Sequence, residues 1–246
     1  MGRLTWQVAT VAAIREETPS ASTLVLDVAG WSSHLAGQHV DVRLTAPDGY
    51  SAQRSYSIAS APTAGSVEIT VQRVPDGEVS GYLAGIARPG DQIEIRGPIG
   101  GYFVWPPPHG DGGAPVLLVA GGSGIVPLMA MVRARADRTP FRLIYSVRGP
   151  GDAIYAPELS RRVRDDRGLD VAYAYTRAAP DGWHGTIGRL DAGRLAADGW
   201  PADFRPNVYV CGPTGFVEKV ADLLVAAGHE ADRIRTERFG PTGGKA

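Results

Sequence analysis

The hydrophobic pattern of the chain changes character between its two halves. Residues 22–28 alternate between apolar and polar side chains, which places Leu24, Leu26 and Val28 on one face of a predicted strand. Similar short runs follow at residues 39–45, 54–60, 67–73 and 92–96. Turns rich in Pro, Gly and Asp separate these runs. Regularly spaced strands with little helix favour an antiparallel barrel or sandwich for the first hundred residues.

The second half instead alternates strands with helices. Val116–Ala120 is continuously apolar, as in a buried parallel strand, and leads through a Gly-rich turn into a helix predicted from Ile125 to about Ala136. Further strands are predicted at residues 142–147, 170–176, 207–211 and 233–237, and further helices at 156–165 and 215–227. This alternation indicates a parallel α/β sheet.

A boundary between two domains is expected in residues 106–113, which are rich in Pro and Gly and poor in core residues. A chain of 246 residues is long enough for two domains of ordinary size. We place the domains at residues 1–108 and 109–246.

Composition excludes several classes of protein and site. A net charge of −1 gives no electrostatic footprint for nucleic acid. No apolar run approaches the ~20 residues that cross a membrane, and the N-terminus lacks the pattern of a signal peptide. We therefore expect a cytoplasmic monomer with no nucleic-acid or membrane partner. Cys211 is the only cysteine, which excludes an internal disulfide, a cysteine-ligated iron–sulfur cluster and a zinc ribbon, and no metal site is expected.

Two predicted strands of the second half end in glycine. Gly121-Gly-Ser-Gly124 precedes a helix, where glycines allow close backbone approach and free N–H groups favour a phosphate. The turn is not a Rossmann fingerprint, because Pro127 occupies the third glycine position, and no P-loop Lys follows. A tight strand–helix connection explains this turn equally well. The second such turn, Val210–Gly215, favours a nucleotide site, because ligands lie beyond the carboxyl ends of strands in open α/β sheets.

The first half holds two further candidate ligand-binding segments. Arg54 and Tyr56 lie on one face of a predicted strand, where a cation beside an aromatic ring suits a phosphate joined to a planar ring system. The alternative is an Arg that covers a barrel surface. Gly77-Glu-Val-Ser80 could open a short helix with backbone N–H groups and Ser80 directed at a phosphate, or form an ordinary turn.

Six motifs occur in order along the chain. They are Arg54-Ser-Tyr-Ser57, Gly77-Glu-Val-Ser80, Gly97-Pro-Ile-Gly-Gly-Tyr-Phe103, Gly121-Gly-Ser-Gly-Ile-Val-Pro127, Cys211-Gly-Pro213 and Glu237-Arg-Phe-Gly-Pro241. Together they resemble the ferredoxin–NADP reductase superfamily, which includes oxygenase reductases and the reductase half of flavohaemoglobins. The resemblance implies a six-stranded antiparallel flavin-binding β-barrel followed by a parallel α/β NAD(P)-binding domain.

The resemblance also implies which residues hold the flavin. Arg54, Ser55, Tyr56 and Ser57 are all candidates for binding the cofactor. Arg54 would bind the flavin phosphates, Tyr56 would pack on the ring system, and Ser57 would hydrogen-bond near flavin N5. Strand alternation places Ser57 opposite Tyr56, so its role requires a strand end or a backbone contact. The pyrophosphate would be bound by Gly77, Val79 and Ser80, which favours FAD over FMN.

The remaining motifs are implied to serve the nicotinamide nucleotide. It would be received by Gly121, Gly122, Ser123 and Gly124. Cys211, followed by Gly212 and Pro213, would lie near the nicotinamide C4, although a lone Cys is also typical of a small buried hydrophobe. Thr176 and Arg177 end a strand where NADP-using relatives bind the 2′-phosphate, and Arg148 could assist, which favours NADPH over NADH.

The C-terminal motif is implied to lie over the flavin. Phe239 would cover the isoalloxazine ring, although Gly240–Ala246 continue the chain beyond it. Glu237 would serve in proton movement or pair with a neighbouring Arg.

The implied activity is hydride transfer from NAD(P)H to flavin N5, with Ser57, Cys211 and Glu237 as catalytic candidates. Electrons would then pass to a separate acceptor protein such as a ferredoxin, an oxygenase or another metalloenzyme, because the single cysteine of the chain cannot hold a cluster of its own. One alternative is a reductase of free flavin or of a small molecule. Another is a redox-sensing regulatory protein that binds FAD.

Overall fold

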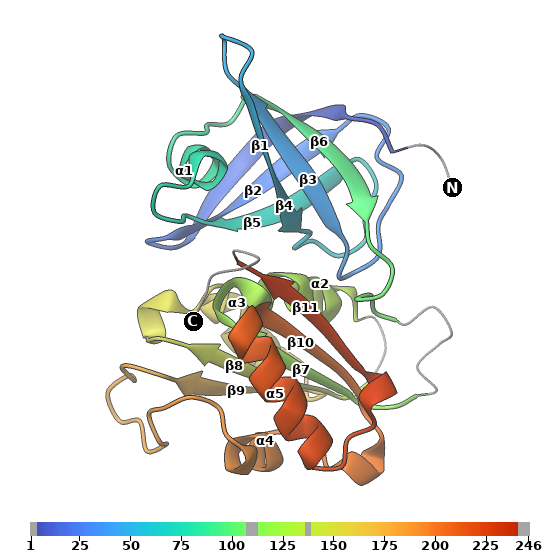
Figure 1. The fold of residues 1–246 in the computed structure, drawn as a ribbon, viewed down its shortest axis with the longest axis vertical. Helices are drawn as coiled ribbons and strands as arrows, with labels where there is room; N and C mark the ends of the chain where they lie inside the picture. The colour runs from blue at the N-terminus through green and yellow to red at the C-terminus, as the bar shows by residue number, and fades with distance from the viewer. Residues whose placement is uncertain (1–3, 107–112, 136–138, 241–246) are drawn as a thin grey trace. The chain divides into compact units, whose positions relative to one another are not determined.

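The computed structural model describes residues 4–106, 113–135 and 139–240. Contacts between Cα atoms divide the chain into two compact units (Figure 1). The first is Met1–Pro108 with Met129–Ala134, and the second is His109–Leu128 with Arg135–Ala246. The boundary expected between residues 108 and 109 lies outside the described residues.

The first unit is an antiparallel sheet of six strands in the order β4-β3-β6-β1-β2-β5. The strands are β1 (Gln7–Thr18), β2 (Ala21–Val28), β3 (His39–Thr45), β4 (Ser51–Ser57), β5 (Ser66–Gln72) and β6 (Gln92–Ile99), and helix α1 is Glu78–Gly85. An antiparallel bridge between Ile58 and Ile69 brings the two edge strands together just beyond β4. The sheet therefore curls on itself, which confirms the barrel predicted from the sequence.

Strands β1, β4 and β6 differ from their sequence-based prediction; β6 ends at Ile99, three residues beyond its predicted end. The long strand β1 was not predicted, because a bulge between Val11 and Ala13 shifts its side-chain alternation by one residue. Ala9 and Val11 are fully buried before the bulge, whereas Ile14 is only half-buried after it. Strand β4 begins three residues earlier than predicted, because its polar first half carries no hydrophobic signal.

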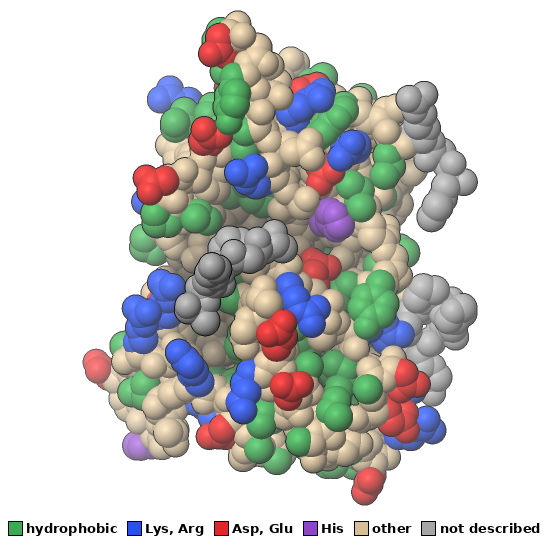
Figure 2. Space-filling model, viewed as in Figure 1, with side chains coloured by type: hydrophobic (Ala, Val, Ile, Leu, Met, Phe, Trp, Pro, Cys, Tyr) green, Lys and Arg blue, Asp and Glu red, His purple; other side chains and the backbone are tan. Residues whose placement is uncertain are grey.

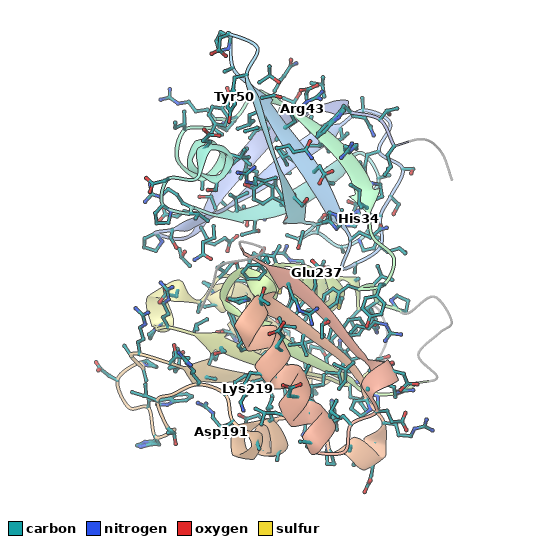
Figure 3. All side chains as sticks on the ribbon, in the orientation of Figure 1. His34, Arg43, Tyr50, Asp191, Lys219 and Glu237 are labelled. Atoms are coloured by element: carbon teal, nitrogen blue, oxygen red, sulfur yellow. The ribbon has the colours of Figure 1, made fainter. Side chains whose placement is uncertain are left out.

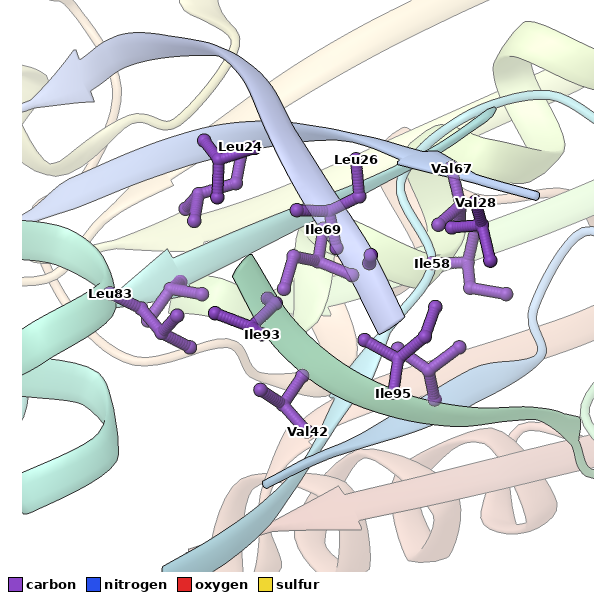
Figure 4. Packing of buried hydrophobic residues seen from close by; sticks show 14 of the residues in the cluster. Leu24, Leu26, Val28, Val42, Ile58, Val67, Ile69, Leu83, Ile93 and Ile95 are labelled. Atoms are coloured by element: carbon purple, nitrogen blue, oxygen red, sulfur yellow. The ribbon is translucent and has the colours of Figure 1, made fainter. Parts of the chain in front are cut away.

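The barrel core lies between the strands and helix α1. Leu24, Leu26 and Val28 of β2 are buried, as their alternation predicts, and belong to one hydrophobic cluster with residues of β5 and β6 (Figure 4). Val79 and Leu83 of α1 join the same cluster. Each such side chain contributes about 1.5–3 kcal/mol by leaving water, so the core holds α1 firmly against the strands.

The second unit is a parallel sheet of five strands in the order β11-β10-β7-β8-β9. Its strands are β7 (Val116–Gly121), β8 (Phe141–Val147), β9 (Leu169–Tyr175), β10 (Asn207–Pro213) and β11 (Ile234–Phe239). Its helices are α2 (Ile125–Ala134), α3 (Ala156–Asp165), α4 (Ala192–Asp198) and α5 (Thr214–Ala226), although Met129–Ala134 of α2 are grouped with the first unit. The parallel α/β prediction is confirmed. No helix among the described residues is long and apolar enough to span a membrane.

Helices α4 and α5 share one hydrophobic cluster with the sheet. Leu195 of α4 and Val217 of α5 pack with Leu117 and Val119 of β7, and Figure 1 shows α5 running across the sheet. Short helix α4 was not predicted; its N-cap is Asp191, whose carboxylate accepts a hydrogen bond from the Arg194 N–H (2.9 Å). All six residues of β7 are buried, as expected for a central parallel strand, so β7 and its neighbour β10 place their carboxyl ends side by side.

Candidate functional site

Strand β4 carries the Arg–Tyr pair of the first unit. Arg54 is paired across the ladder with Val42, and Tyr56 is paired with Val40. Both valines are fully buried in the barrel, so Arg54 and Tyr56 share the inward face of the strand, as its alternation predicts. Arg54 stays exposed, whereas burial raises the pKa of Tyr56 to about 12, against the opposing charge of Arg54. The strand thus presents a cation beside a half-buried aromatic ring.

The two serines of the same motif face the other side of the strand. The Ser55 hydroxyl donates to Asp41 Oδ1 (2.6 Å), and Arg96 Nη2 donates to Asp41 Oδ2 (2.6 Å). Burial tends to raise the pKa of Asp41, but these two hydrogen bonds hold it below its ordinary value. The Ser55 hydroxyl is therefore committed to this network, and any contact of Ser55 with a cofactor falls to its backbone. Ser57 lies opposite Tyr56, at the last position of β4 and in register with His39.

The start of helix α1 is held by its own side chains. Gly77 is its N-cap, and a Cβ at this position would collide with the Ser80 hydroxyl. That hydroxyl accepts from the Val74 N–H (3.2 Å) and donates to the Gly77 carbonyl (3.4 Å). Ser80 thus shapes the loop, while Val79 anchors the helix in the core. The first turn of α1 could bind a phosphate through the backbone N–H groups that have no partner within a helix.

This part of the first unit fits a dinucleotide that carries a planar ring. Helix α1 packs against β4, and the Tyr50 hydroxyl, just before β4, donates to Glu78 Oε2 at the first position of α1 (3.0 Å). An exposed guanidinium, an aromatic ring and a helix N-terminus are the groups that bind phosphates and a flavin ring. Tyr50 and Glu78 were not predicted from the sequence, because their partnership depends on a tertiary contact.

The two Gly-rich strand ends of the second unit meet in space. Ala120 of β7 is in register with Cys211 of β10. A Cβ on Gly124 would collide with the backbone carbonyl of Cys211, and one on Gly121 or Gly212 would press on the Phe216 ring. These three glycines are therefore required by packing between β7, β10 and α5. Phe216, four residues beyond Gly212, was not predicted to have this role.

Gly122 differs from these three glycines. Its φ of +55° is in the left-handed region that favours glycine, and no atom lies within 4 Å of the position where a Cβ would point. Gly122, Ser123 and Gly124 form a single 3₁₀ turn directly before α2. The turn therefore combines open space with the start of a helix, which is an arrangement that favours phosphate.

Cys211 is buried, with an exposed fraction of 1%. Burial, together with the nearby Glu237 carboxylate, raises the pKa of its thiol well above the ordinary value. Cys211 is in register with Glu237, and Pro213 with the last residue of β11, Phe239. The Phe239 side chain is 37% exposed, and Pro241 of the C-terminal motif lies outside the described residues. The raised pKa keeps the Cys211 thiol neutral within its buried surroundings. Glu237, its neighbour in register on β11, is labelled in Figure 3.

Arg148 and Arg177 lie together at the carboxyl ends of β8 and β9. The Thr176 N–H donates to the Val147 carbonyl (2.9 Å), and the Arg177 N–H donates to the Arg148 carbonyl (2.9 Å). Both guanidinium groups are on exposed residues, and neither has an ion pair with another described residue. Figure 2 shows Lys and Arg side chains gathered along one flank of the second unit. Two free cations at one sheet edge suit an additional phosphate.

Comparison with known proteins identifies both units. A family model described as the oxidoreductase FAD-binding domain matches residues 9–104, and one described as the oxidoreductase NAD-binding domain matches residues 118–222. The two matches follow the division into a barrel and a parallel sheet.

Individual relatives are reductases. The chain is 32% identical over 212 residues to the glycine betaine monooxygenase reductase subunit of Pseudomonas aeruginosa, covering 84% of this chain and 56% of that protein. It is 31% identical over 239 residues to an NADPH oxidoreductase of Mycobacterium tuberculosis, covering 92% and 58% respectively. The chain thus spans less than two thirds of these curated relatives. Among solved structures, the cytochrome P450 reductase of Amycolatopsis superposes with a TM-score of 0.84 at 26% identity, covering 98% of this chain and 72% of that one.

Proposed function

The chain belongs to the ferredoxin–NADP reductase superfamily of oxidoreductases, in which an FAD-binding domain precedes an NAD-binding domain, and we propose that it passes electrons from NAD(P)H through bound FAD to a separate acceptor protein. The observation that carries this proposal is the presence of two distinct candidate ligand-binding sites in one chain. One is the Arg54–Tyr56 face of β4 beside α1, and the other is the Gly-rich turn that joins β7 to α2.

In the first site, Arg54 and the start of α1 bind the phosphates of FAD, and Tyr56 packs on its ring system. When bound, the flavin supplies the redox chemistry: it accepts two electrons as a hydride and can release them singly. Ser57, at the last position of β4, would donate a hydrogen bond near flavin N5. Ser80 and Gly77 keep the loop in the conformation that exposes its N–H groups.

In the second site, the turn around Gly122 binds the nucleotide phosphates. The buried thiol of Cys211 orients the nicotinamide by its shape, because its raised pKa keeps it neutral. Glu237, beside Cys211 in register, holds or moves a proton, and the exposed ring of Phe239 packs on a planar ligand. These roles are part of the proposal, and each rests on the placement of the residue at the carboxyl end of the sheet.

Arg148 and Arg177 set the preference for NADPH over NADH. The 2′-phosphate distinguishes NADPH, and guanidinium groups bind phosphate with directed hydrogen bonds. These two arginines have no competing carboxylate partner among the described residues. The free cations therefore favour the phosphorylated nucleotide.

The acceptor is proposed to be a component of an oxygenase. The relative in Pseudomonas aeruginosa is the reductase subunit of a monooxygenase, and the Amycolatopsis protein is a cytochrome P450 reductase. Both names place the reductase beside a separate oxygen-activating partner.

Anaerobic mixing of the purified protein with NADH and with NADPH tests the proposal. We expect the flavin absorbance to bleach with both nucleotides and faster, at low concentration, with NADPH. Bleaching by neither nucleotide would contradict the proposal and favour a redox-sensing FAD protein. Subsequent turnover with free FMN, but none with a supplied ferredoxin or oxygenase, would replace the acceptor protein with a small-molecule acceptor.

A further inference from the structure

Gln38, the residue directly before β3, is bonded to three separate segments of the first unit. Its side-chain carbonyl accepts from the Leu35 N–H (2.7 Å), and its Nε2 donates to the Gly100 carbonyl (2.7 Å). Its backbone carbonyl accepts from the Ile58 N–H (2.9 Å). Ile58 and Gly100 directly follow the last residues of β4 and β6. Gln38 therefore joins the ends of both strands that flank β3.

The side-chain bond to Gly100 lies where the ladder between β3 and β6 is irregular. His39 is in register with Ile99, but Asp41 is in register with Arg96, so β6 carries one extra residue here. Such a bulge disrupts the backbone hydrogen bonds around it. The β3–β4 ladder has no shift, and its continuation to Ile58 uses only backbone atoms. The identity of the side chain therefore matters on the β6 side, and Figure 1 shows β4 and β6 ending at the same end of the barrel.

The loop before Gln38 is itself held in place. Trp31 Nε1 donates to His34 Nδ1 (3.4 Å), so the imidazole hydrogen is on Nε2, which donates to the Ser60 carbonyl (3.1 Å). His34 is 4% exposed, and burial lowers its pKa, which keeps it neutral. The Trp105 N–H donates to the Ala36 carbonyl (3.0 Å). Gln38 thus projects from a fixed support.

The turn at Gly100 lies beside the end of β4. A Cβ on Gly100 would be 3.7 Å from His39 Nδ1, and its φ of +103° is in the region that favours glycine. His39 is in register with Ser57. One side chain therefore separates the turn from Ser57.

We propose that Gln38 is a positioning residue for hydride transfer, whose amide holds the Gly100 turn against His39 and thereby keeps Ser57 in place beside the flavin ring. This role rests on the proposed function, in which Ser57 donates near flavin N5. An amide accepts and donates at the same time, whereas a carboxylate only accepts. A misplacement of about 1 Å at a reacting centre can lower a rate by about 100-fold, so a bond that touches no substrate can decide the rate.

Hydrogen–deuterium exchange of the flavin-free protein tests the bond itself. We expect the amides of residues 100–105 to exchange about 2- to 12-fold faster in both Gln38→Glu and Gln38→Leu, the value of one hydrogen bond. The Leu35 N–H should stay protected in Gln38→Glu, which keeps the acceptor, and lose protection in Gln38→Leu. The matched control, Gln72→Glu, makes the same chemical change at the last position of β5 and should exchange like the unmodified protein.

Anaerobic stopped-flow reduction of bound FAD by NADPH tests the role. Both Gln38 variants should be reduced at least fivefold more slowly, with FAD affinity within twofold of the unmodified protein, because the proposed phosphate-binding groups do not contact Gln38. Lowering the pH towards 4.3, the ordinary Glu pKa, protonates the carboxyl of Gln38→Glu and restores a donor. The rate gap to the unmodified protein should then narrow for Gln38→Glu and stay constant for Gln38→Leu, since all three proteins share the titration of His34 and His39.

Three results would overturn the role of Gln38. Unchanged exchange of residues 100–105 in both variants would show that the amide does not hold the turn. Faster exchange with an unchanged reduction rate, or a rate gap in Gln38→Glu that does not respond to pH, would separate the bond from hydride transfer. Equal fold losses in FAD affinity and reduction rate would reduce Gln38 to a general role in the fold. An unmodified protein that does not bind FAD, or whose FAD is not reduced, would instead contradict the proposed function.

Discussion

The substitution Gly124→Ala tests whether the turn after β7 is in direct contact with the backbone at the end of β10. A Cβ at this position would overlap the carbonyl group of Cys211 and approach the Gly212 nitrogen to 2.8 Å. All of these atoms belong to the backbone of β10, so no side chain can rotate away. The turn and the strand must part by roughly 1 Å before the contact becomes tolerable.

Overpacking of this kind costs about 1–3 kcal/mol of unfolding free energy. For a protein of this size, each kcal/mol shifts the melting temperature by about 2–4 °C, so Gly124→Ala should lower it by about 2–12 °C. The FAD content of the purified variant should not change, because Gly124 and Cys211 both lie in the second unit. Affinity for the nicotinamide nucleotide should fall, because the turn that we propose to bind its phosphates is displaced.

The matched control is Gly215→Ala. Gly215 is the second residue of α5, has no atom within 4 Å of its Cβ position, and does not have a positive φ. The same substitution there should stabilise the helix by up to about 1 kcal/mol. Differential scanning calorimetry of the two variants therefore gives shifts of opposite sign. A Gly124→Ala protein that melts within about 1 °C of the unmodified protein would refute the packing argument.

Three further predictions concern single side chains. Arg54→Ala should reduce the affinity for FAD about 10- to 150-fold, the value of a charge-assisted hydrogen bond, and full flavin occupancy after purification would count against its phosphate role. Arg177→Ala should raise the KM for NADPH at least about tenfold and leave that for NADH nearly unchanged; equal effects on both would remove the specificity argument. Cys211 should react slowly with iodoacetamide at pH 8 until the protein is unfolded, because its pKa is raised in the fold. For the same reason its contribution to stability should be complete below the unfolded thiol's pKa of about 8.5 and decline as pH rises above it, and fast labelling of the native protein would contradict this.

The elements that the sequence predicted well are those with an uninterrupted pattern. Residues 156–165 were predicted as a helix, and α3 has these bounds. The apolar run at Val116 became a fully buried β7. Strand β1 was missed because its bulges arise in its pairing with β2, which the local sequence does not reveal. Pattern alone thus locates an element but does not reveal register shifts imposed by its neighbours.

The sequence predicted the candidate site about as well as it predicted the fold. Alternation along β4 correctly placed Arg54 and Tyr56 on one face and Ser57 on the other. It did not reveal that the Ser55 hydroxyl is bonded to Asp41, or that the Ser80 hydroxyl closes its own loop. Both hydroxyls find partners that depend on the folded backbone, so a motif position alone does not say which atom remains for a ligand.

Three glycines of the motifs in the second unit are required by the fold itself, independently of any ligand. Gly121, Gly124 and Gly212 are each required by contacts within the protein, with Phe216 or with the backbone of β10. Any chain that crosses two strand ends this closely needs them, whichever nucleotide it binds. Within the Gly121–Gly124 turn, Gly122 is the glycine with open space beside it for a ligand. We therefore expect discrimination between nucleotides to come from side chains on other strands, such as the arginines that we propose for this role at the carboxyl ends of β8 and β9.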